Sequence, residues 1–179
     1  MAIQKCRFQA LVRSTCMVTN ASDPATVLPR TEWQAILIDA AVEVFSTTVG
    51  VAVTVPVESG LPSPSRMTGM VGIAGEIRAV FSLSSSAESG IKIASLMLGI
   101  AADDPGAEKA ACDAVGEVCN IISGYFKARI GLGDKCSLSV PTIVKGKNYK
   151  IHSTTDCERF QFPLLFEEQT LWLSLDISK

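Results

Sequence analysis

One long stretch near the middle of the chain decides the fold, residues 103–133, which read DDPGAEKAACDAVGEVCNIISGYFKARIGLG. Its acidic start makes Asp104 a typical N-cap, and Pro105 follows at the first helical position, where proline is favoured. Apolar residues then recur at helical spacing until glycines predict the end of the helix at about Ile130. The stretch therefore predicts one helix of about seven turns.

This helix has two distinct sides when its residues are placed at about 100° intervals. The apolar side, which must pack on a sheet, contains Ala111, Val115, Val118, Ile122 and Phe126. The opposite side carries a polar stripe made of Asp113, Glu117, Asn120 and Gly124. A glycine inside a helix costs about 1 kcal/mol relative to alanine, so Gly124 suggests the close approach of a partner. A solvated face is the plain alternative, because every amphipathic helix has one.

The remaining elements are short and follow one another closely. Helical spacing predicts a first helix from Thr31, its expected N-cap, to Gly50. A capping box from Ser85 to Glu88 predicts another helix, through about Leu98. β-Branched and alternating residues predict strands over 51–57, 67–73, 76–84, 137–144, 149–154, 159–166 and 171–177. The second and third of these strands form a hairpin, with its turn at residues 74–75.

The element order predicts an α+β fold, with helices packed on an antiparallel β-sheet. Strands follow one another without helices between them in the order α-β-β-β-α-α-β-β-β-β, which favours antiparallel pairing. Pro163 lacks an N–H donor, so its strand is expected at an edge or bulged there. Residues 1–30 show no sustained period and are expected to be an N-terminal extension, and residues 31–179 one domain.

Composition narrows the class of protein. The 179 residues are 47% hydrophobic and carry 16 basic and 18 acidic side chains, for a net charge of −2. This balance excludes disorder and a nucleic-acid binder that depends on basic charge. No apolar run approaches a membrane span, and no signal peptide opens the chain, so we expect a cytoplasmic protein. Six scattered cysteines fit free thiols, and the single histidine, His152, excludes a two-histidine metal site.

Several motifs resemble those of the CheX family, relatives of the CheC chemotaxis phosphatases. Residues 113–127, which read DAVGEVCNIISGYFK, resemble the signature helix of that family. Residues 70–83 resemble its central hairpin, and residues 93–99 resemble its next helix. Residues 138–141 with Gly146 resemble its following strand. The resemblance covers roughly residues 31–177, with the motifs in the expected order.

The resemblance implies a CheC/CheX-like phosphatase for the aspartyl phosphate of a CheY-like response regulator in two-component signalling. It implies that Glu117 engages the regulator's active-site lysine and that Asn120 orients the attacking water. Asp113 and Gly124 would belong to the partner-binding surface, although Asp113 is more simply explained as solvated. The Mg²⁺ ion would belong to the regulator, with no metal or cofactor held by this chain. A homodimer with sheets joined at an edge is also implied.

Some residues depart from the family pattern or leave alternatives open. Cys119 and Tyr125 stand where a small residue and often Asn are expected, and Tyr125 could alter which regulator fits. A similar stripe in the first helix contains Asp39, Glu43, Ser46 and Gly50. The alternatives are a duplicated site in which Ser46 replaced Asn and a generic polar stripe. We favour the generic stripe and predict no catalysis there. A non-catalytic module that binds a receiver domain or a flagellar-switch-type partner is the second hypothesis. A thiol-dependent enzyme, inactivated by alkylation, is the third.

Overall fold

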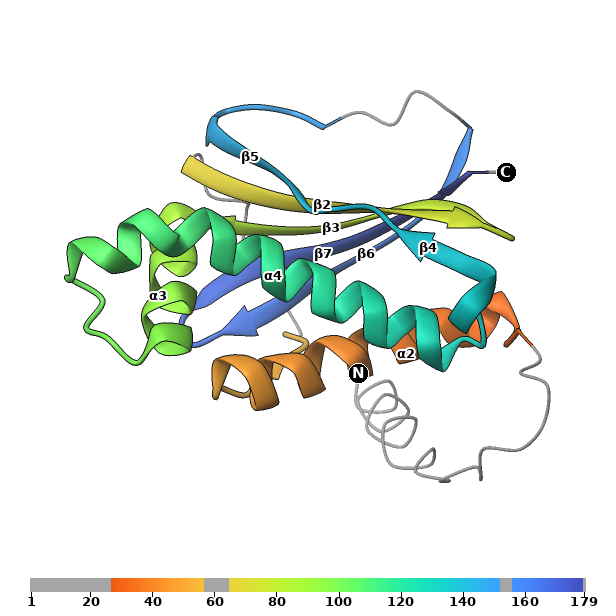
Figure 1. Cartoon of the computed structure of the whole chain (residues 1–179), viewed down its shortest axis with the longest axis horizontal. Helices are drawn as coiled ribbons and strands as arrows, with labels where there is room; N and C mark the ends of the chain where they lie inside the picture. The colour runs from red at the N-terminus through yellow and green to blue at the C-terminus, as the bar shows by residue number, and fades with distance from the viewer. Residues whose placement is uncertain (1–26, 57–64, 152–155, 179) are drawn as a thin grey trace, which may run out of the picture.

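Three helices cover one face of an antiparallel sheet in the computed structural model, which describes residues 27–56, 65–151 and 156–178 (Figure 1). The helices are α2 (Arg30–Val44), α3 (Ala87–Leu98) and α4 (Pro105–Arg129). A π-helical turn, Phe45–Val49, extends α2, and a 3₁₀ turn, Gly133–Lys135, follows α4. α4 runs across the front of the molecule, with α2 below it and α3 beside its N-terminal half (Figure 1).

The sheet confirms the predicted α+β fold. Its seven strands in the described chain pair in the order β1-β6-β7-β3-β2-β4, all antiparallel, and β5 pairs with β2 beside β4. The strands are β1 (Val53–Thr54), β2 (Ser65–Gly75), β3 (Arg78–Ser86), β4 (Cys136–Leu138), β5 (Thr142–Lys147), β6 (Cys157–Phe166) and β7 (Gln169–Ser178).

The central β2–β3 hairpin forms as predicted, but its turn lies two residues later. Ala74 still pairs with Arg78, so the chain reverses at residues 76–77. Gly75 ends β2 with a φ of +150°, and a Cβ there would lie 2.2 Å from the carbonyl oxygen of Lys135. Gly75 is therefore a close-packed strand end and not the turn itself.

Helix α4 begins and ends where the sequence predicts. The Asp104 carboxylate accepts a hydrogen bond of 2.7 Å from the backbone N–H of Gly106, and Pro105 is the first helical residue. Gly131 follows the helix with a φ of +81°, a conformation that glycine adopts without strain.

The N-caps of the other two helices differ from those predicted. The N-cap of α2 lies two residues earlier than expected, at Pro29, and Thr31 lies inside the helix. In α3 the N-cap is Ser86, whose hydroxyl accepts a 2.9 Å hydrogen bond from the N–H of Ser89. The predicted cap, Ser85, is still part of β3 and is buried. In α3, strand pairing of β3 with β2 through Ser86 therefore outweighs the local capping signal.

Three predicted strands are wrong in extent. The predicted strand 137–144 is two short strands, β4 and β5, separated by residues 139–141. Residues 149–151 of the predicted strand 149–154 are not a strand, and its other residues lie outside the described ranges. Of the predicted strand 51–57, only β1 forms within the described residues, and residue 57 lies outside them. The predicted order of elements is nevertheless the observed one, because the split strand replaces the missing one.

Pro163 lies at an unpaired edge of β6, as predicted. β6 pairs with β7 along its whole length, including Pro163 with Trp172. On its other side, β1 pairs only with Leu165 and Phe166. Among the described residues, no strand lies beside Pro163 on the β1 side of β6. The missing N–H of the proline therefore costs no hydrogen bond there.

The core lies between the helices and the sheet. Every residue of the predicted apolar side of α4 is fully buried. The rings of Phe126 and Trp33 meet edge to face, with their centres 5.8 Å apart, and join α4 to α2. A Cβ on Gly69 of β2 would lie 3.2 Å from both the Cβ of Cys119 and the carbonyl oxygen of Val115. α4 therefore approaches β2 more closely than most side chains would allow.

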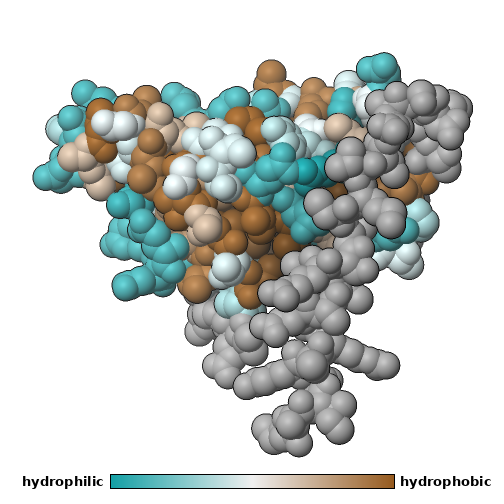
Figure 2. Space-filling view, turned by 90° about the horizontal axis from the view of Figure 1, so that it is seen from below, coloured by the Kyte–Doolittle hydropathy of each residue, from teal (hydrophilic) through white to brown (hydrophobic). Residues whose placement is uncertain are grey.

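The outer side of α2 differs in character from that of α4. Ile36, Ile38 and Val42 are only partly buried, and apolar side chains gather on this lower face in Figure 2. In the described ranges, no helix is both long and apolar enough to span a membrane. Residues 1–26 of the predicted extension over residues 1–30 lie outside the described ranges. That this segment is separate from the domain therefore stays a prediction.

Candidate functional site

The polar stripe of α4 faces solvent in the structure. Asp113 and Glu117 are exposed, and Asn120 and Gly124 are half-buried. All four lie within one continuous helix, and Glu117 and Asn120 stand one turn apart on the same side. The structure thus brings together the four residues singled out in the sequence, as one ridge along α4.

Glu117 and Asn120 are not used by the fold itself. Among the described residues, neither side chain makes a hydrogen bond or an ion pair. By contrast, most charged side chains near the helix ends are paired, such as Lys127 with the carbonyl oxygen of Cys136 at 2.8 Å. A carboxylate and a carboxamide are therefore presented outward with their hydrogen-bonding capacity unused.

The orientation of the pair is set by buried neighbours on the same helix. Val118 and Cys119 lie between Glu117 and Asn120 in sequence and are fully buried. The hydroxyl of buried Ser123 donates a 2.8 Å hydrogen bond to the carbonyl oxygen of Cys119, within the same turn. Because this packing fixes the rotation of α4 about its axis, Glu117 and Asn120 cannot turn toward the core.

Two glycines of α4 have different surroundings. A Cβ on Gly116 would lie 3.0 Å from Cδ1 of Ile143 and 3.4 Å from Cβ of Pro141, so the fold itself requires a small residue there. A Cβ on Gly124 would have only one neighbour outside its own helix within 4 Å, Cδ1 of Leu138 at 4.0 Å. Internal packing explains Gly116 but not Gly124.

The similar stripe on the first helix has a different environment. The Glu43 carboxylate forms an ion pair with the guanidinium of Arg129 at the end of α4. Ser46 lies in the π-helical turn, outside the regular helix. Arg129 also lies 5.8 Å from the centre of the Tyr125 ring. Equal spacing in sequence therefore gives one unpaired carboxylate, Glu117, and one paired carboxylate, Glu43.

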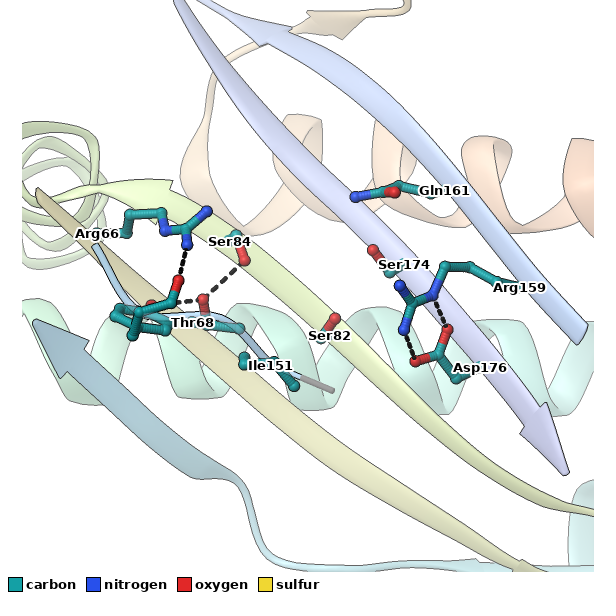
Figure 3. A pocket seen from close by; sticks show the side chains of 10 residues that line it. Arg66, Thr68, Ser82, Ser84, Ile151, Arg159, Gln161, Ser174 and Asp176 are labelled. Atoms are coloured by element: carbon teal, nitrogen blue, oxygen red, sulfur yellow. Dashed lines mark hydrogen bonds and ion pairs between the residues drawn. The ribbon is translucent and has the colours of Figure 1, made fainter. Parts of the chain in front are cut away.

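A shallow hollow of about 130 Å³ lies on the other face of the sheet, away from α4 (Figure 3). Its charged groups are already paired. Arg159 donates two hydrogen bonds to Asp176, of 2.6 and 2.7 Å, and Arg66 stacks 4.8 Å from the Tyr149 ring centre and bonds to its carbonyl oxygen. These contacts hold the open face of the sheet together and do not involve the stripe.

The described chain contains no group of three or more His, Cys, Asp or Glu side chains placed to hold a metal ion. His152, Cys6 and Cys16 lie outside the described residues. The expectation that Mg²⁺ is supplied by a partner stays a prediction.

Two features of the site were not found from the sequence. One is the close packing of Gly116 against Pro141 and Ile143. Gly116 is also a glycine inside a helix, so the cost that drew attention to Gly124 is a signal for Gly116 as well. The other is the link between β4 and β5, residues 139–141, which lies beside α4 and was predicted as strand.

Solved structures with the same fold include several chemotaxis proteins. A CheX from Desulfovibrio desulfuricans has a TM-score of 0.69 at 21% identity, covering 82% of this chain and 99% of that chain. A chemotaxis protein from Desulfovibrio vulgaris Hildenborough has a TM-score of 0.69 at 24% identity, covering 82% and 97%. A CheX from Borrelia burgdorferi, crystallised with CheY, BeF₃ and Mg²⁺, has a TM-score of 0.65 at 21% identity, covering 84% and 100%.

The sequence model of the chemotaxis phosphatase CheX family matches residues 67–165, more than half of the chain. No curated protein is similar enough in sequence to match it. The chain belongs to the CheX chemotaxis phosphatase family, as its motifs predict.

The Cys119 thiol is expected to be unreactive in the folded protein. Burial raises its pKa from 9.0 to about 12, although a backbone hydrogen bond with Leu83 acts in the opposite direction. The stability that the protonated thiol contributes is present below pH 9 and is lost as the pH rises through about 12. At pH 8, N-ethylmaleimide should label half-buried Cys112 or Cys157 before Cys119, as measured by peptide mass spectrometry.

Denaturant should abolish this difference. Labelling of Cys119 in the native protein as fast as in the unfolded protein would contradict the assignment. Full dephosphorylation activity after labelling of the accessible thiols would exclude the thiol-dependent hypothesis.

Proposed function

We propose that this protein accelerates hydrolysis of the aspartyl phosphate on a CheY-like receiver domain in the cytoplasm, with Glu117 and Asn120 at its active site. One observation carries the proposal. In a member of the CheX family, a carboxylate and a carboxamide stand one turn apart on a rigid helix, exposed or half-exposed and without partners among the described residues.

Asn120 is suited to orienting a water molecule toward phosphorus. Its carboxamide oxygen can accept a hydrogen bond from the water, and its NH₂ group can donate one, without a change of protonation state. Phosphoryl transfer depends mainly on positioning and on stabilising charge, and an acyl phosphate has a good leaving group. A single well-held amide is therefore enough to supply the proposed step.

Glu117 is suited to holding the partner in register. Its exposed carboxylate can form a charge-assisted hydrogen bond with an ammonium group such as the lysine near a receiver's phosphorylation site. The Mg²⁺ ion and the phosphoryl group would both belong to the partner. The Borrelia burgdorferi CheX, with its CheY, BeF₃ and Mg²⁺ in one crystal, supports this division for the present chain.

We also propose that the protein is a homodimer with two sheets joined at an edge. The second candidate function is a family member that binds a receiver or a flagellar-switch-type partner without hydrolysis. The two functions are separated by timing phosphate loss from a panel of phosphorylated receiver domains of the same genome. Acceleration of one receiver supports the phosphatase, and binding at an unchanged phosphate lifetime supports the binding module.

Asn120→Ala should remove the acceleration while leaving the fold and partner binding intact. Loss of the water-positioning group is expected to lower kcat by at least about 100-fold, because the nucleophile is no longer held in line. Phosphate release from the cognate receiver measures this, and a pull-down with the beryllofluoride-bound receiver measures binding. A kcat near that of the wild type would show that Asn120 does not position the water.

Glu117→Gln should weaken binding of the receiver domain and change the stability of the fold much less. It keeps the shape of the side chain but removes the charge, so the charge-assisted contact loses about 1.5–3 kcal/mol. The expected rise in Kd for the beryllofluoride-bound receiver is about 10- to 150-fold, with a weaker dependence on salt than in the wild type. Glu108→Gln, which is exposed near the start of α4 and lies outside the polar stripe, is the matched control and should change Kd much less.

Gly124→Ala and Gly116→Ala should have opposite effects. Because a Cβ at Gly124 meets little of the fold, alanine there should raise stability by up to about 1 kcal/mol while reducing the acceleration severalfold. Alanine at Gly116 would press on Ile143 and should lower stability. Thermal unfolding and phosphate release measure the two effects. An unchanged rate for Gly124→Ala would remove that glycine from the partner surface.

A further inference from the structure

Val140 is more exposed than any other large apolar side chain in the described part of the chain. It is 82% exposed, whereas the next, Leu98, is 55% exposed. Val140 lies in the middle of the link between β4 and β5 and contributes little to the core. An isolated exposed valine needs no explanation, so its position relative to the site decides whether it matters.

Three contacts place this link along the flank of α4. Going up the chain from β4, Cys136 accepts the hydrogen bond from Lys127, Leu138 faces Gly124, and Pro141 packs on Gly116. The chain over residues 136–141 therefore runs antiparallel to α4. The eight residues from Gly116 to Gly124 span about 12 Å of helix, and three residues of extended chain span about 10 Å.

Asn120 lies halfway between the two glycines, so the middle of the link passes at its level. Residues 139 and 140 stand between the contacts at Leu138 and Pro141. The backbone at Val140 therefore passes at the level of the half-buried Asn120 along the helix axis, within one helical turn of the level of Glu117.

The backbone of the link is held firmly. The N–H of Ser139 donates a 2.9 Å hydrogen bond to the carbonyl oxygen of Gly72, and the N–H of Gly72 donates one of 2.9 Å to the Ser139 hydroxyl. The following proline, Pro141, favours an extended conformation at Val140. Val140 is thus kept outward by a fixed backbone, beside groups that the fold leaves unpaired.

We propose that Val140 is a docking contact for the receiver domain, packing against an apolar part of the partner's surface beside its phosphorylation site. This rests on the proposed function. Interfaces commonly combine a buried apolar contact with adjacent polar groups, and the apolar contact excludes water around them. Here Val140 supplies the apolar contact, and Glu117 and Asn120 supply the polar groups. A contact of this kind selects among receivers by the apolar surface beside the phosphorylation site and not by the phosphoryl group itself.

The test compares Val140→Asp and Val140→Ala with Val80→Asp. Val80 is 44% exposed on the opposite face of the sheet and is the matched control. Phosphate release is measured over a range of phosphorylated receiver concentrations, together with binding of the beryllofluoride-bound receiver. Val140→Asp should raise KM and Kd about tenfold, and Val140→Ala a few fold, with kcat within about twofold of the wild type. Val80→Asp should leave all three unchanged.

Several results would overturn the proposal. KM and Kd within twofold of the wild type for Val140→Asp, with native circular dichroism, would show that Val140 is not a contact. An equal effect of Val80→Asp would show a non-specific effect of charge. A change in sedimentation mass of Val140→Asp alone would place the residue between two copies of the chain instead. If Val140→Asp fails to fold, Val140→Ala decides.

The proposed function fails in a different way. A wild-type protein that binds a receiver without accelerating its dephosphorylation would contradict the phosphatase, while the Kd values of the variants would still test Val140. A wild-type protein that neither binds nor accelerates any receiver would overturn both.

Discussion

The close contact of α4 with β2 determines which side chains of α4 are buried and which face solvent. At Gly69 the sheet has no side chain, and the backbone of Val115 and the Cβ of Cys119 come within 3.2 Å of the place where one would be. A helix packed this tightly cannot rotate about its axis without a clash. Because Cys119 is pressed against the sheet, its neighbours in the polar stripe must point away from it. The exposure of Glu117 and Asn120 is thus a consequence of core packing.

The sequence predicted those parts of the fold that depend on local chemistry. α4 has its cap, its first-turn proline, its periodicity and its terminal glycine within one segment, and each was correctly placed. The region after it was predicted less well because distant residues decide it. Strand β4 ends at Leu138, and at Ser139 it is the side-chain hydroxyl that accepts the hydrogen bond from the N–H of Gly72, which is 67 residues away. Likewise, β3 continues to Ser86 because Arg66 pairs with it, which moves the α3 cap by one residue.

The candidate site shows the same division. Helical periodicity alone placed Asp113, Glu117, Asn120 and Gly124 on one ridge, and the family resemblance gave that ridge its expected chemistry. Periodicity could not separate Glu117 from Glu43, which have equivalent positions in similar stripes. The difference arises because Arg129, at the C-terminal end of α4, pairs with Glu43 on α2, whereas no described residue pairs with Glu117. Only the three-dimensional arrangement distinguishes an occupied carboxylate from an available one.

The polar ridge of α4 and the link at residues 139–141 are neighbours in space but separate segments of the chain, so each can be substituted independently of the other. The helix carries residues whose replacement would disturb the core, because buried positions alternate with the ridge. The link begins ten residues after the end of α4 and is anchored through its backbone, so its outward side chain can change without repacking the interior. Under the docking role proposed for Val140, one substitution in this link would change the choice of partner while the helix and the core stay the same.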